Sequence, residues 1–310
     1  MQHNLENYGL CRAAQFGQSD VCLDLLQRCA DPEFVNALSY GRSPIYSAVF
    51  WSGWVEEVDE VDAYIDTVRH LVRYGANVSV VNDDGDTPMH AAIRETPVLE
   101  FLKILLDSPG PKNVNLKYKG QTPLMLAMST ESLSIEIHEL VQDQVCVLLA
   151  HGADVHTVDN LGNSVLHQER IDNFLLEKFL EHGVDINRRG EKGLTALHAL
   201  VQKAADHPSN VYYHRMRLLA KVQMFIDAGC DIGIVDNRGF TAEDTAISYF
   251  GEESAVSVLL LNARRRLEES RLAFAMGYHP RLGINAHHGD FDANLIQMIL
   301  NPRYFEPTHI

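Results

Sequence analysis

Histidine and cysteine are the residue types through which this chain could bind a metal or act as a nucleophile. His90, His167 and His198 lie tens of residues apart, whereas zinc ligands usually come in pairs a few residues apart. A group of histidines within 279–288 has no cysteine or second cluster beside it. The five cysteines form no C-x-x-C pair, and their odd number indicates reduced, mostly buried thiols. We therefore expect no metal site and no cofactor.

Sequence motifs of the common enzyme classes are also absent. The chain has no G-x-x-x-x-G-K-[ST] or G-x-G-x-x-G phosphate loop, no H-E-x-x-H and no G-x-S-x-G. Carboxylates are numerous, but none form a focused pair suited to acid–base catalysis. We expect a protein that is not an enzyme.

Composition narrows the class of partner. The 310 residues carry a formal net charge of −16, which argues against general binding to nucleic acid or anionic membranes, since phosphates attract Lys and Arg. The apolar stretches are far shorter than the ~20 residues that span a bilayer. Residues 1–30 lack the layout of a signal peptide. We expect a monomer in the cytoplasm, with the nucleus as a second compatible compartment, whose protein partner has a basic surface.

Two short phrases alternate along the chain. The second phrase contains a glycine that follows an apolar helical run, and reads YGANV, HGADV, HGVDI and AGCDI, with glycines at 75, 152, 183 and 229. The first phrase reads GRSPIY, GDTPMH, GQTPLM, GNSVLH, GLTALH and GFTAED, with glycines at 41, 85, 120, 162, 193 and 239.

Each phrase has a structural reason. Ser or Thr before Pro predicts a helix start, because the hydroxyl accepts a bond from a free N–H and Pro suits the first turn. A glycine after an apolar helical run predicts the end of a helix. The histidines of the first phrase are expected to hydrogen-bond neighbouring backbone.

These phrases resemble the ankyrin repeat family, whose repeats carry G-x-T-P-L-H and later G-A-D-V-N. The resemblance implies an all-α fold: an α-solenoid of helix–loop–helix repeats with hairpin loops, in which stacked neighbours form the core. We expect an array over 1–263 and a C-terminal extension over 264–310. The seven repeats are expected near 6–40, 41–84, 85–119, 120–161, 162–192, 193–238 and 239–263.

The spacing departs from the expected period of about 33 residues. The second, fourth and sixth repeats are too long, and the extra residues fall within 50–63, 129–141 and 202–213. These insertions are expected to lengthen the helices or the loops between them. They are either tolerated loop growth or a second contact surface. In the fifth repeat, Glu169 replaces a small residue, which predicts a looser stack or a shortened helix.

The tail has two interpretations. A helix is expected from about Glu252 to Gly277, and a short amphipathic helix over about 290–300. These helices either cap the open end of the array or resemble the F-box-like or SOCS-box-like helices of ubiquitin-ligase substrate receptors. The Leu-Pro start of an F-box is absent, since Phe291-Asp292 stands there.

The resemblance implies non-catalytic protein recognition through the concave face of the array. The alternative is a substrate-recognition adaptor whose extension docks a ubiquitin-ligase core. The expected contact residues lie at hairpin tips and on first helices: Phe50, Trp51, Asp83, Asp84, Arg94, Glu95, Tyr118, Lys119, Asn160, Leu161, Glu191, Lys192, Asn237 and Arg238.

Two of these predictions concern particular chemistry. Phe50 and Trp51 precede a run of acids over 56–62, and aromatics beside acids suit a basic partner, although the tryptophans could instead cover the core of the enlarged loop. Asn187 resembles an ankyrin asparagine that an oxygenase hydroxylates, and its alternative role is to brace the turn.

Overall fold

The computed structural model describes residues 2–278, except for 30, 56, 97, 111, 130–134, 169 and 207–210. Within this described part the protein is helical, and its β-structure is limited to the isolated bridges Ser39–Arg42 and Tyr118–Gln121. The chain divides into two compact parts, Met1–Glu191 and Lys192–Ile310. The expected all-α solenoid is confirmed.

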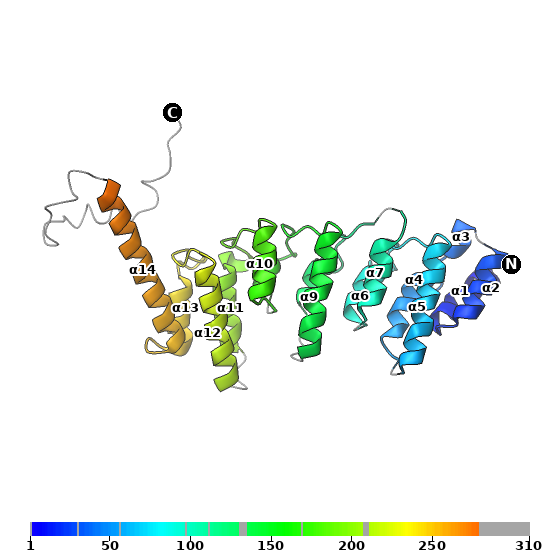
Figure 1. Ribbon diagram of the computed structural model, residues 1–310, viewed down its shortest axis with the longest axis horizontal. Helices are drawn as coiled ribbons and strands as arrows, with labels where there is room; N and C mark the ends of the chain where they lie inside the picture. The colour runs from blue at the N-terminus through cyan, green and yellow to red at the C-terminus, as the bar shows by residue number, and fades with distance from the viewer. Residues whose placement is uncertain are drawn as a thin grey trace, which may run out of the picture. The chain divides into compact units, whose positions relative to one another are not determined.

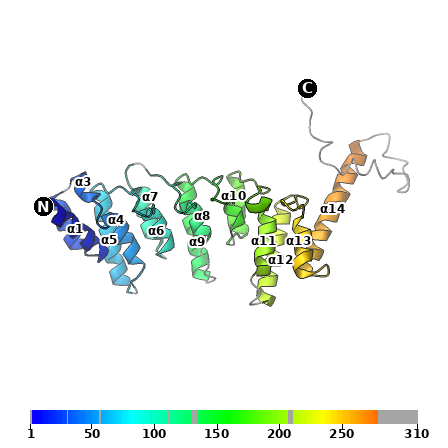
Figure 2. The same cartoon turned by 180° about the vertical axis from the view of Figure 1, so that it is seen from behind.

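The helices of the N-terminal part form two rows (Figures 1 and 2). In the first row α1, α4, α6, α8 and η1 pack each on the next, and in the second row α2, α5, α7, α9 and α10 do the same. The elements are α1 Gln2–Gln15, α2 Ser19–Arg28, α3 Pro32–Val35, α4 Pro44–Ser52, α5 Val58–Arg73, α6 Pro88–Arg94, α7 Leu99–Asp107, α8 Pro123–Met128, α9 Ile135–Ala150, η1 Val165–His167 and α10 Asn173–Glu181.

The C-terminal part has the same construction. Helices α11 and α13 pack together, as do α12 and α14, and each first-row helix also contacts its second-row partner. The bounds are α11 Ala196–Asp206, α12 Val211–Asp227, α13 Ala242–Phe250 and α14 Ala255–Tyr278, after the short turn η2 Glu191–Gly193. Helix α14 confirms the long helix expected from about Glu252 to Gly277, as the extended second helix of the last repeat. The short helix predicted over 290–300 lies outside the described residues.

The helix starts follow the predicted capping chemistry. The side chains of Ser43, Thr87 and Thr122 each accept a hydrogen bond from the backbone N–H three residues later, and Pro follows each of them. A cap of this kind stabilises a helix by about 1 kcal/mol. The helix-ending glycines have positive φ, between 79° and 88°, which a residue with a side chain rarely adopts.

The apolar core lies between the two rows of helices. Phe101 and Leu105 of α7 are fully buried against Val68 and Leu71 of α5, which are equally inaccessible. Burial of one such side chain contributes roughly 1.5–3 kcal/mol. Because part of this contact comes from the neighbouring repeat, a single repeat would leave these side chains exposed.

The insertions lengthen helices, which was one of the two expected outcomes; the other was longer loops. The second-row helices of the overlong repeats, α5, α9 and α12, have 16, 16 and 17 residues. Those of the other repeats, α2, α7 and α10, have 10, 9 and 9. In the N-terminal part, α5 and α9 extend past α7 and α10 at one edge (Figure 1).

The fifth repeat departs from two full helices. Its first-row element is the three-residue 3-10 turn Val165–His167, in place of a helix of six to nine residues. This confirms the shortened helix predicted there. Glu169 itself lies outside the described residues.

The hairpin tips, which we call fingers and name by their glycine, alternate between two conformations. In the Gly41, Gly120 and Gly193 fingers the preceding residue also has positive φ: 51° at Tyr40, 49° at Lys119 and 55° at Lys192. Successive positive φ values are the requirement of a type I′ turn, the tight turn of two-residue hairpins.

The other three fingers are built on an Asn or Asp side chain. Asn82 accepts bonds from the N–H groups two and four residues later, and Asp159 and Asp236 do the same. The two finger types contact each other in pairs. The N–H of Asp83 donates to the carbonyl of Gly41 (3.1 Å), and that of Asn237 to Lys192 (3.0 Å).

Asparagine clamps follow the same alternation. Asn36 donates to the Gly75 carbonyl and accepts from the Asn77 N–H, and Asn115 makes the matching bonds to Gly152 (3.3 Å) and Asp154 (2.8 Å). Helix length, finger type and clamp all repeat every second repeat. The structural period of this array is therefore a pair of repeats.

Replacement of Asn115 by Ala is expected to lower the free energy of unfolding by about 1–2 kcal/mol, because two hydrogen bonds between the third and fourth repeats are lost. Urea unfolding followed by circular dichroism measures this. Asn113→Ala is the matched control, since the Asn113 side chain is exposed and makes no bond in the described structure. Equal losses for both variants would contradict the clamp.

Candidate partner-binding face

A buried carboxylate organises the face formed by the first-row helices α4, α6 and α8 and their fingers, which we call the first-helix face. Asp86 is fully buried and accepts hydrogen bonds from the Tyr46 hydroxyl (3.0 Å) and Arg94 Nη2 (2.7 Å). Burial, followed by the charge of Asp86, raises the pKa of Tyr46. Asp86 therefore joins the second repeat to the third.

Arg94 extends this network to the fourth repeat. Burial lowers the pKa of Arg94, but the hydrogen bonds to Asp86 and Glu95 outweigh it and raise the pKa, so the side chain stays charged. Its guanidinium Cζ lies 5.3 Å from the ring centroid of Tyr118, and Lys119 Nζ lies 5.0 Å from the same ring. The structure thus brings together four residues predicted from the sequence: Arg94, Glu95, Tyr118 and Lys119.

His90 lies beneath the same network. Its Nδ1 is 2.8 Å from the Thr87 hydroxyl, and its ring is tilted against Tyr118 at 5.7 Å. Burial lowers the pKa of His90, and the nearby Asp86 only partly offsets this. The predicted bonding of histidine to neighbouring backbone is confirmed at His198, whose Nε2 lies 3.1 Å from the Phe240 carbonyl.

Aromatic side chains line α4 of this face. Phe50 stacks on Tyr46 with ring centroids 5.9 Å apart, and Trp51 meets Phe50 edge-on at 5.5 Å. Phe50 and Trp51 are half-buried and pack on the core, whereas Trp54 is 69% exposed. The idea that both tryptophans cover a loop core is therefore wrong for Trp54.

The finger residues predicted as contacts lie at the tips. Asp83 and Asp84 are exposed on the Gly85 finger, and the Asp83 carboxylate lies directly over Gly41. On the Gly162 finger, Asn160 lies over Gly120 in the same way and Leu161 is 57% exposed. Asp83 and Asn160 therefore support neighbouring fingers as well as facing solvent.

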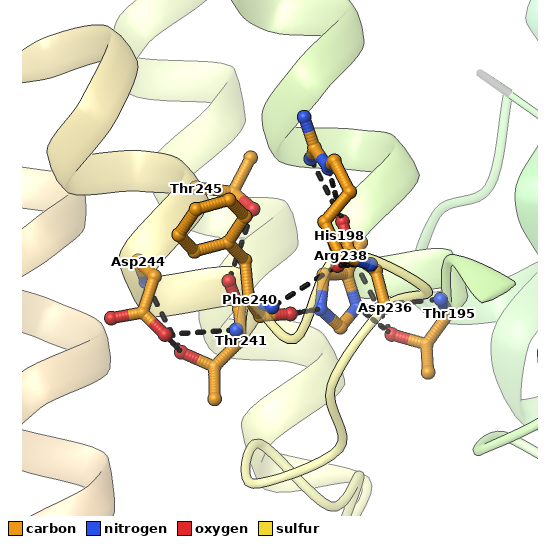
Figure 3. A network of polar contacts seen from close by, with 8 residues as sticks. All are labelled: Thr195, His198, Asp236, Arg238, Phe240, Thr241, Asp244 and Thr245. Atoms are coloured by element: carbon orange, nitrogen blue, oxygen red, sulfur yellow. Dashed lines mark hydrogen bonds and ion pairs between the residues drawn. The ribbon is translucent and has the colours of Figure 1, made fainter. Parts of the chain in front are cut away.

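The C-terminal part has its own finger network (Figure 3). Burial raises the pKa of Asp236, but the hydrogen bonds from the Phe240 N–H and from Arg238 hold that pKa below its ordinary value. Arg238 Nε donates to Asp236 at 2.8 Å, and the Arg238 guanidinium lies 5.3 Å from the Phe240 ring centroid. Arg238 is thus fixed to its own finger, with its side chain still exposed.

The remaining predicted positions are placed as follows. Lys192 and Asn237 are joined by a backbone hydrogen bond in the C-terminal part. The Glu191 N–H donates to Asn163 in the N-terminal part. Asn187 follows Asp185, whose side chain accepts its N–H. Its hydroxylation stays a prediction.

Sequence reasoning missed the centre of the first-helix face. Tyr46, Asp86 and Arg42 were not predicted, and they make the contacts that order Arg94 and Phe50. One signal was present: Arg42, Tyr46 and Phe50 are four residues apart, the spacing of one helix face.

No group of three or more His, Cys, Asp or Glu side chains that could hold a metal occurs among the described residues. None of the described helices is both long enough and apolar enough to cross a membrane.

A family model for ankyrin repeats, in three copies, matches residues 60–141 of the chain. The mouse B-cell lymphoma 3 protein homolog is 29% identical over 164 residues, covering 50% of this chain and 32% of that protein. The chicken nuclear factor NF-kappa-B p105 subunit is 30% identical over 192 residues, covering 58% and 17%. The chain thus spans about a third or less of these relatives.

Solved structures show the same fold. The ankyrin repeat domain of Bcl-3, described as a unique member of the IkappaB protein family, superposes with a TM-score of 0.59 at 23% identity, covering 82% of this chain and 97% of that one. The human ASB11 ankyrin repeat domain gives 0.54 at 20% identity, covering 82% and 96%.

Replacement of Asp86 by Ala is expected to lower the free energy of unfolding by about 3 kcal/mol, because the buried Tyr46 hydroxyl and Arg94 both lose their acceptor. Thermal or urea unfolding measures the change. Asp84→Ala is the control, since that carboxylate is exposed at a fingertip. A loss for Asp86→Ala no larger than the control's would contradict the network.

His90 is expected to titrate below its ordinary pKa of about 6.5. A histidine whose pKa is lower in the folded state binds a proton more readily in the unfolded state. The stability that the neutral ring contributes is therefore lost as the pH falls from about 6.5 toward the folded pKa. An NMR titration of the His90 ring resonances measures the pKa directly. Protonation of that ring above pH 6.5 would disprove the burial effect.

Proposed function

This chain is built of ankyrin repeats, and we propose that it is a non-catalytic scaffold that binds a partner protein through its first-helix face. Ankyrin repeats are protein–protein interaction modules. The observation that carries the proposal is the ordering of aromatic and charged side chains at this face around Asp86. Side chains fixed before binding lose little conformational entropy on association. The fingertip residues add exposed charge and Leu161 at its border.

Location and partner chemistry follow as further parts of the proposal. The cytoplasm, with the nucleus as second compartment, is the proposed location, in keeping with the buried thiols of Cys11 and Cys22, whose pKa burial raises to about 12. The net charge of −16 favours a partner with a basic region, since complementary charge steers association.

A fingertip variant tests the proposal. The triple substitution Asp84→Lys, Lys119→Glu and Leu161→Asp alters three exposed positions, and is expected to reduce at least tenfold the proteins captured from cell lysate. The matched control makes the same kinds of substitution, acid to base, base to acid and apolar to acid, at exposed positions of the second-row helices: Asp143→Lys, Lys103→Glu and Phe174→Asp. Circular dichroism verifies that both variants fold.

The opposite result would overturn the proposal. If the second-row variant loses the captured proteins and the fingertip variant keeps them, binding occurs on the other row of helices. If neither variant changes capture, neither face is the site.

The alternative function, a ubiquitin-ligase adaptor, concerns the extension over 264–310. Helix α14 has 24 residues, far more than the second-row helices of the other repeats that lack an insertion. Arg264 within α14 pairs with Glu243 of α13 at 3.1 Å. A chain ending at residue 277 separates the two roles. A folded truncation that loses cullin-type partners and keeps the others supports an adaptor. One that unfolds, or keeps every partner, supports a cap.

A further inference from the structure

Arg42 differs from the other arginine at the centre of the first-helix face. Its guanidinium Cζ lies 4.8 Å from the Phe50 ring centroid and 5.9 Å from that of Tyr46, and the residue is half-buried. Within the described part of the chain it has no ion pair and no side-chain hydrogen bond. Arg94, by contrast, is paired with both Asp86 and Glu95. An arginine held in place with its donors unused is suited to a carboxylate, which accepts two parallel N–H bonds.

The rings beneath Arg42 are themselves held in place. The Tyr46 hydroxyl is anchored to Asp86, and Phe50 stacks on Tyr46 with an interplanar angle of 18°. Trp51 packs edge-on against Phe50 at 82°. The carboxylate of Asp83 lies over Gly41, and in the described part of the chain it forms no ion pair with Arg42. Arg42 therefore offers an ordered cation, held over Phe50, to an incoming acidic group.

The chain that follows α4 carries the opposite charge. Trp54 is 69% exposed two residues past the helix, and Glu57, Asp59 and Glu60 follow it, exposed at the start of α5. These three carboxylates form no ion pair with a cation of the described chain. A basic group of a partner would meet several negative charges there.

The Arg42 guanidinium lies over Phe50, in the second half of α4, and Trp54 and the acidic residues follow that helix in the chain. We propose that Phe50, Trp51 and Trp54 bind a segment of a partner protein that presents an acidic residue to Arg42, apolar residues to the aromatic rings, and a basic residue to the acids that follow Trp54.

This inference rests on the proposed function, and it narrows the expected partner from a basic surface to a segment with both charges in a defined order. A uniformly basic segment would place a cation on Arg42, and a uniformly acidic one would meet Glu57, Asp59 and Glu60. Like charges in contact disfavour the wrong partner as effectively as opposite charges favour the right one. Nucleic acid is disfavoured for the same reason.

Selection from a displayed library of random 12-residue peptides on the full chain tests the charge order. The expected result is enrichment of peptides that carry an acid and a base, in one consistent order, with apolar residues between them. Enrichment without a charge order, or of one charge sign only, would overturn the proposal.

Direct binding of one selected synthetic peptide, measured by fluorescence anisotropy, tests the residues. Arg42→Gln is expected to weaken binding at least tenfold, and Arg42→Lys to restore it only in part, because Lys lacks the planar fork. Replacement of the peptide's acid by its amide should cost nothing further in the Arg42→Gln variant. The matched control is Arg73→Gln, because Arg73 is exposed on α5 and has no ion pair with another described residue, and it should stay within twofold of wild type.

The outcomes separate this inference from the proposed function. If lysate capture depends on the fingertips while Arg42→Gln binds the peptide as wild type does, the charge-ordered site is wrong and the scaffold function stands. If capture is insensitive to the fingertips, the scaffold function at this face is wrong. Thermal unfolding of each variant excludes loss of fold as the cause.

Discussion

The fold depends on one constraint: a single repeat cannot bury its own apolar face. The fully buried Phe101 of α7 is covered partly by α5 of the preceding repeat, and the same relation holds along both rows of helices. Stability is then a sum over neighbouring interfaces, in which apolar contacts bury the core and polar contacts fix the register between repeats. Asp86 and the asparagine clamps do this. The same contacts order the first-helix face for binding.

The helix starts and helix ends were predictable from the sequence, because each signal residue is only a few residues from the helix terminus that it marks. Ser43, Thr87 and Thr122 cap their helices as their place before Pro indicates, and the glycines of the second phrase end helices with positive φ. The Asp86 network was not predictable, since Tyr46 and Asp86 are 40 residues apart and meet only through stacking. The type I′ fingers were missed because Tyr40 and Lys119 are not residues that favour positive φ.

The site residues that were predicted are those fixed by their position in the repeat, and those that were missed depend on packing between repeats. Arg94, Glu95, Tyr118 and Lys119 were chosen by their place in the repeat, and the structure brings them together around one carboxylate and one ring. Arg42 was not predicted, because its lack of an acceptor among the described residues follows from packing and not from a sequence pattern.

The alternation of finger types has a consequence for how such an array can grow. Glycines 85, 162 and 239, which mark the Asn- and Asp-based fingers, are evenly spaced at 77 residues. Insertion of one repeat would place two fingers of the same type side by side and break a finger contact such as that of Asp83 with Gly41. Duplication of two repeats preserves every contact. A two-repeat block is therefore the smallest segment whose duplication keeps the two finger types in alternation.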